Sequence, residues 1–146
     1  MTKKPTFSRI SILLFALSLA APLLQAAEED VPPIVAQMRQ INQNLRTLRG
    51  QFDQPSLKSQ NIELVDAIRT HVKAAQQLEP LKTPQIPVDQ RPAFLKDFRA
   101  ELDKVLGTLD QLKGALQSGD TEAAKALLLK LNDLKREGHQ EFKSPE

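Results

Sequence analysis

Residues 95–119, LKDFRAELDKVLGTLDQLKGALQSG, carry the most regular apolar pattern in the chain. The large apolar residues recur at alternating spacings of three and four positions: Leu95, Phe98, Leu102, Val105, Leu109, Leu112 and Leu116. This spacing puts them on one face of an α-helix, and such a face is normally buried against other elements. Ser118 and Gly119 predict the end of this helix.

Three more segments show the same helical spacing, and no segment alternates with the period of two that is typical of a strand. Asp30 followed by two prolines favours the start of one helix, and Asp120 is a natural N-cap for another. We therefore predict further helices over about 30–50, 56–79 and 120–143.

The second and third predicted helices are separated by residues 80–92, which contain four prolines in thirteen positions and cannot continue a helix. The other two connections are short. Because short connections join antiparallel neighbours, the sequence predicts an all-α fold, an antiparallel up-down-up-down four-helix bundle.

The first 27 residues resemble a secretory signal peptide. Lys3, Lys4 and Arg9 precede an apolar stretch over 10–21, and small residues follow at 26 and 27. The apolar stretch is shorter than the roughly 20 residues that a membrane-spanning helix needs. We therefore expect cleavage after residue 27 and a single exported domain over 28–146, with no membrane segment after the signal is removed.

Charge and cysteine content exclude several classes of function. The 20 Lys and Arg against 18 Asp and Glu become 17 against 18 without the predicted signal, and no basic stripe is interleaved with aromatic residues, so no nucleic-acid partner is expected. The chain contains no cysteine, which excludes disulfides, thiolate metal sites and covalent haem attachment. It also shows no enzyme motif.

Met38 and His139 are the candidate metal ligands. An up-down-up-down bundle brings the start of its first helix and the end of its last helix to the same end, where these two residues lie within about one turn of the same level. A thioether and an imidazole together can fill both axial positions of haem iron. This pair predicts electron transfer rather than catalysis.

Other interpretations of these residues stay open at this point. Met38 could simply fill a gap in the core, and His139 could be a solvated residue that interacts with the dipole of its helix end. The same pair could also hold Cu(I). His71, at the edge of the apolar face of the second helix, is a rival ligand. A haem-free helical adaptor or stress-related binding protein is the alternative function.

Three motifs support a resemblance to a known family. They are Met38 followed by INQNL at 41–45, KDFR at 96–99, and HQEFK at 139–143. With these motifs the chain resembles the cytochrome b562 family over nearly all of its predicted mature length. The resemblance implies a periplasmic, monomeric electron-transfer protein that carries one non-covalent haem b and meets an unidentified redox partner protein.

The resemblance also assigns residues to the haem site. It implies that Met38 and His139 are the axial ligands of the iron, and that the residues around the porphyrin include Ile41, Leu45, Phe98, Leu102 and Lys143. Leu102 stands where the family has an aromatic residue, and Lys135 and Lys143 stand where it more often has arginine. Lysine lacks the planar fork that grips a carboxylate, so weaker haem retention is expected.

Overall fold

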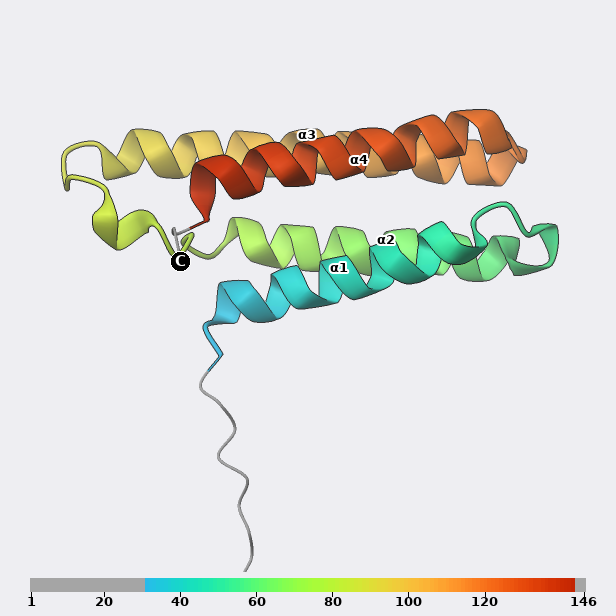
Figure 1. The fold of residues 1–146 in the computed structure, drawn as a ribbon, viewed down its shortest axis with the longest axis horizontal. Helices are drawn as coiled ribbons and strands as arrows, with labels where there is room; N and C mark the ends of the chain where they lie inside the picture. Colours follow the sequence, from blue (N-terminus) through green and yellow to red (C-terminus); the bar gives the residue numbers. More distant parts are fainter. Residues whose placement is uncertain (1–30, 144–146) are drawn as a thin grey trace, which may run out of the picture.

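A computed structural model of the chain describes residues 31–143 (Figure 1). Four long helices make up most of this part: α1 (Pro33–Gln51), α2 (Lys58–Gln76), α3 (Arg91–Ser118) and α4 (Thr121–Phe142). Two short 3₁₀ helices lie in the connections, η1 (Pro55–Leu57) before α2 and η2 (Thr83–Gln85) before α3. The predicted signal peptide and the predicted helix start at Asp30 fall outside the described residues.

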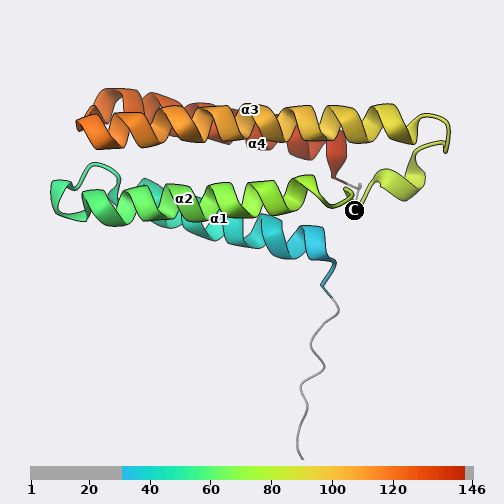
Figure 2. The same cartoon turned by 180° about the vertical axis from the view of Figure 1, so that it is seen from behind.

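The helices run antiparallel in chain order, and α1 packs against α2, α2 against α3, and α3 against α4. The predicted four-helix bundle is therefore confirmed. Figures 1 and 2 show that the start of α1, the end of α4 and the proline-rich connection lie at one end of the bundle. We call this the ligand end, because the two candidate ligands belong to it.

Local sequence explains where the helices begin and end. Gly119 follows α3 with a φ of 76°, a left-handed conformation that glycine adopts without strain. The Asp120 side chain then accepts a hydrogen bond of 2.9 Å from the Ala123 backbone N–H, as expected of an N-cap. Helix α3 begins before the predicted Leu95, at Arg91, because Pro92 in the first turn removes no helical hydrogen bond.

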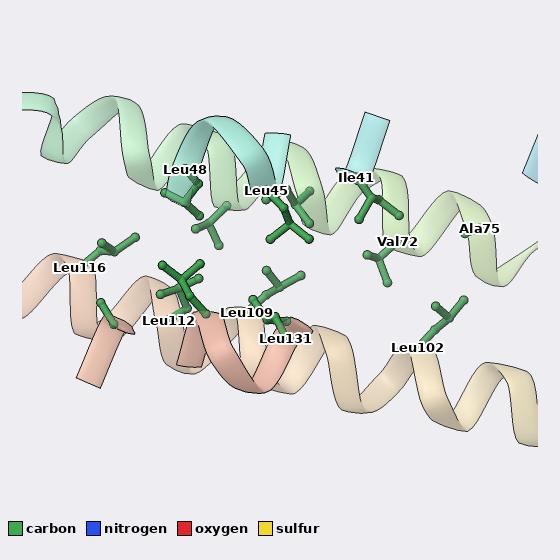
Figure 3. Close-up of a cluster of buried hydrophobic side chains, with 14 of the residues drawn as sticks. Ile41, Leu45, Leu48, Val72, Ala75, Leu102, Leu109, Leu112, Leu116 and Leu131 are labelled. Carbon is green, nitrogen blue, oxygen red and sulfur yellow. The ribbon is translucent and has the colours of Figure 1, made fainter. Parts of the chain in front are cut away.

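The apolar stripes of all four helices form one core. Its largest fully buried apolar side chains are Leu48, Val65, Ile68, Val72, Leu109 and Leu112. Figure 3 shows side chains of the two helix pairs meeting between the ribbons. Because each helix places its residues at intervals of three and four on the inner face, the predicted stripes coincide with the observed core.

One polar side chain is completely buried at the end of the bundle opposite the ligand end. Asn61 on α2 is 0% exposed, and its amide accepts a hydrogen bond of 2.9 Å from Gln51 Nε2. Its Nδ2 donates a bond of 3.1 Å to the backbone oxygen of Gln51. These bonds join the end of α1 to α2, so Asn61 stabilises the connection between the first two helices.

Replacing Asn61 with alanine should lower the free energy of unfolding by about 1 to 3 kcal/mol, because the carbonyl and the side-chain amide of the half-buried Gln51 lose their partner. Urea denaturation of the haem-free chain measures this change. Gln60→Ala is the matched control, since Gln60 is exposed on the same helix and should change stability by less than about 0.5 kcal/mol. Equal values for the two variants would contradict this role of Asn61.

Candidate functional site

A cavity of about 290 Å³ lies at the ligand end, and its volume is just below the range of roughly 300 to 1,000 Å³ that is typical of ligand pockets. All four helices and the connection after α2 contribute to its walls. Most of the lining side chains are apolar. The charged and titratable side chains among them are Arg39, Glu101, Lys135, His139 and Lys143.

Every residue that the sequence analysis assigned to a haem site lines this one cavity: Met38, Ile41, Leu45, Phe98, Leu102, His139 and Lys143. Met38 comes from α1 and His139 from the last turn of α4, so a thioether and an imidazole from two helices share one apolar space. Ile41, Leu45, Phe98 and Leu102 are buried, Met38 is half-buried, and His139 and Lys143 are exposed. The cavity therefore reaches the surface beside α4.

The seam between α1 and α4 differs from the other helix contacts. The two helices make few close backbone approaches, whereas each helix packs closely against its neighbour in sequence. Side chains of both helices line the cavity, so the seam forms one wall of the site. The backbones of α1 and α4 approach each other less closely than those of the other neighbouring helices, so this wall is the most loosely packed.

Three aromatic rings hold the end of α4 that carries His139. The Phe142 ring centroid lies 5.2 Å from that of Phe94 and 5.3 Å from that of Phe98, both on α3, and the rings are tilted or edge-to-face. Lys82 Nζ, in the connection, donates a hydrogen bond of 2.7 Å to the Glu141 backbone oxygen. Because Phe142 is three residues after His139, these contacts fix the helical turn that presents the imidazole.

Burial and two neighbouring cations act on the titration of His139. The residue is exposed overall, yet it lines the cavity, and its partial shielding from water lowers its pKa below 6.5. Lys135 and Lys143 lower the pKa further, because a second positive charge nearby is unfavourable. The imidazole is therefore neutral near pH 7, which is the state that binds a metal ion.

A family model for cytochrome b562 matches residues 34–143, a range that covers the cavity and all four helices except Pro33, the first residue of α1. The chain belongs to the cytochrome b562 family. No curated protein matches it. Members of the cytochrome b562 family are haem-binding electron carriers and not enzymes, in agreement with the interpretation of the sequence.

His71, the rival ligand, is next to the cavity wall in sequence, beside Val72, but does not itself line the cavity. Its Nδ1 is 2.8 Å from the side-chain oxygen Oε1 of Gln37 on α1. The hydrogen bond instead joins α2 to α1. Within residues 31–143, no group of three or more His, Asp or Glu side chains could hold a metal ion.

The structure adds cavity residues that the sequence analysis did not name for the cytochrome b562 site. Ile34, Leu131 and Leu134 belong to the apolar stripes, and their position at the ligand end could have revealed them. Pro80 and Leu81 lie in the proline-rich connection, which has no periodicity, so the apolar pattern did not identify them. None of the helices described in the structure is long and apolar enough to cross a membrane.

The pKa of His139 in the haem-free chain should fall below 6.5 in an NMR titration of its ring protons, with His71→Gln used to assign the two histidines. The folded chain then binds fewer protons at His139 than the unfolded chain. The folded state therefore has its full stability above about pH 6.5, the pKa of His139 in the unfolded chain. It loses stability as the pH falls through the lower pKa of His139 in the folded chain. A folded pKa above 6.5 would contradict the shielding by the cavity and the two lysines.

Proposed function

We propose that this member of the cytochrome b562 family is a periplasmic electron-transfer protein that binds one non-covalent haem b, with Met38 and His139 as axial ligands. The observation that carries the proposal is that a thioether from α1 and an imidazole from α4 line one apolar cavity. A haem-free adaptor would need neither group at that place. The predicted signal peptide supports the periplasmic location.

The donor atoms of the cavity suit haem iron. Met38 would supply a soft sulfur and His139 a neutral nitrogen, a combination known from electron-transfer haem proteins. Two protein ligands would leave the iron without an open position, which favours electron transfer over oxygen chemistry. Bound haem would supply a one-electron iron couple.

The rest of the cavity suits the porphyrin. Ile41, Leu45, Phe98 and Leu102 are buried and would exclude water from an apolar ring. Lys135 on α4 and Lys143 directly after α4 line the same cavity, where their charges could pair with the haem carboxylates. The chain's own contribution is therefore a dry apolar wall, two ligand atoms and a cationic rim.

A hemin titration tests the proposal. The protein, expressed with its leader and purified from the periplasmic fraction, should bind one equivalent of hemin and give sharp low-spin bands on reduction. The same chain unfolded in urea is the control, since it lacks the cavity. Failure to saturate at one equivalent, or broad high-spin bands, would exclude the cytochrome function and favour the haem-free adaptor.

A further inference from the structure

The charges of α1 are all of one sign. Between Pro33 and Gln51 the helix contains Arg39, Arg46 and Arg49 and no acidic residue. All three arginines are exposed. They are seven and three residues apart, so they follow one side of the helix.

Two observations place this arginine stripe along the seam with α4. Arg39 lines the cavity, next to the candidate ligand Met38. Ten residues further on, Arg49 Nη2 donates a hydrogen bond of 3.3 Å to Asn132 Oδ1 on α4. The stripe therefore borders α4 from the ligand end to the far half of α1.

Three of the four Lys and Arg residues of α4, Lys125, Lys135 and Arg136, lie on the side that faces α1, and only Lys130 lies on the other side. Lys125, Asn132 and His139 are seven residues apart and share one side of the helix, and Asn132 contacts α1 through Arg49. Lys135 and Arg136 follow Asn132 by three and four positions, which puts them beside it.

The acidic residues of the last half of α4 lie on its other side, toward α3. The pKa of Lys104 on α3 is raised by its hydrogen bond to Glu101 and, to a smaller extent, by the charges of Glu137 and Glu141. These two carboxylates therefore lie near α3 rather than near the seam. Asp133 pairs with Arg136 at 2.9 Å within α4.

The seam is thus flanked by a surface that we call the basic face, formed by Arg39, Arg46, Arg49, Lys125, Lys135, Arg136 and Lys143. Three of these residues, Arg39, Lys135 and Lys143, also line the cavity. The basic face therefore adjoins the cavity at the ligand end, where Glu101 on α3 is the one acidic residue of the lining.

We infer that the basic face is the docking surface for a redox protein with an acidic surface, which would exchange electrons with the cavity at the α1–α4 seam. The inference rests on the proposed haem-dependent function. Charges arranged in this way raise the association rate of an oppositely charged partner and orient it. Here the orientation would bring the partner to the nearest edge of the cavity.

Other anionic partners suit the basic face less well. A helix that binds a membrane surface turns an apolar face to the lipid, but the apolar stripes of α1 and α4 are buried in the bundle. A surface for single-stranded nucleic acid offers exposed aromatic rings for stacking, and the phenylalanines of the described residues are buried or half-buried. An acidic protein needs only the charges and polar groups that the face presents.

The test uses the full mature chain, with and without hemin, in an NMR titration with a plant-type [2Fe–2S] ferredoxin as the acidic probe. At low salt, the amide shifts should fall on α1 and on the second half of α4. Binding should weaken strongly at about 0.5 M salt, because the Debye length then shortens to a few ångströms. Arg46→Glu should weaken binding about threefold at low salt.

Arg46 is the informative position because it belongs to the basic face but does not line the cavity, so its variant should bind hemin like the parent chain. Lys73→Glu is the matched control, with the same change of charge on an exposed lysine of α2, and it should leave ferredoxin binding unchanged. Equal effects of the two variants, or shifts confined to α2 and α3, would overturn the inference.

Vesicles containing anionic phospholipid are titrated in parallel. If they move the amides of the basic face while ferredoxin does not, the acidic-protein inference is wrong and the face binds membranes. The hemin titration distinguishes a failure of the docking surface from a failure of the proposed function. A chain that binds hemin but not ferredoxin loses only the docking surface, whereas a chain that fails to bind hemin loses the proposed function itself.

Discussion

Met38→Ala should abolish the low-spin, sulfur-ligated spectrum of the hemin-loaded protein and weaken hemin binding by at least about tenfold. The reason is that Met38 is the one sulfur of the described residues, and it lines the same cavity as His139. Alanine removes the thioether while leaving the helix intact, since alanine is a strong helix former. Visible spectra of both oxidation states and a hemin titration measure the change.

Val35→Ala is the matched control for this prediction. Val35 also lies on α1, is half-buried and lines the cavity, but it has no donor atom. This variant should keep the low-spin spectrum even if its affinity falls slightly through lost packing. An unchanged spectrum in Met38→Ala would exclude Met38 as a ligand, and the double variant with His71→Ala would then show whether His71 takes its place.

Phe142→Ala should have the largest effect on stability, lowering the free energy of unfolding of the haem-free chain by about 3 to 5 kcal/mol. Phe142 is 5% exposed, and its ring is placed between those of Phe94 and Phe98. Its loss would leave a cavity and free the last turn of α4, which carries His139. Hemin affinity should therefore fall together with stability. Chemical denaturation and a hemin titration measure the two effects.

Two further variants separate local from global effects of Phe142. Phe52→Ala removes a half-buried ring that packs against the core at the opposite end of the bundle, so it should lower stability but leave hemin affinity nearly unchanged. Phe142→Leu keeps much of the apolar volume and should fold even if the alanine variant does not. Equal hemin affinity of Phe142→Leu, Phe52→Ala and the parent chain would contradict the role of Phe142 in placing the ligand helix.

The helical repeat explains why most of the fold could be predicted from the sequence. Each helix must bury one stripe, so the spacing of residues such as Leu109 and Leu112 reveals both the helix and its inner face. Gly119 and Asp120 predicted the third connection, because glycine adopts the left-handed conformation after α3 and the Asp120 side chain accepts a hydrogen bond from the backbone at the start of α4. The short connections then determined the antiparallel order.

Part of the site could also be predicted, because the position of a residue along the bundle axis follows from its distance in sequence from the end of its helix. Met38 and His139 were placed at the same end by their positions in the first and last helices, and both line the cavity. Side-chain hydrogen bonds between elements could not be predicted in this way. The contact of Lys82 with the end of α4 and that of His71 with Gln37 depend on helix rotation and on an irregular connection.

The loosely packed α1–α4 seam has a consequence for the order in which the protein matures. The two walls that would hold the iron come from the first and the last helix of residues 31–143, so a chain that ends before α4 lacks one side of the cavity. A truncated product that ends before α4 would contain Met38 but have no partner for it. Haem uptake would thus select for full-length, folded molecules, and the ligand would stabilise only these.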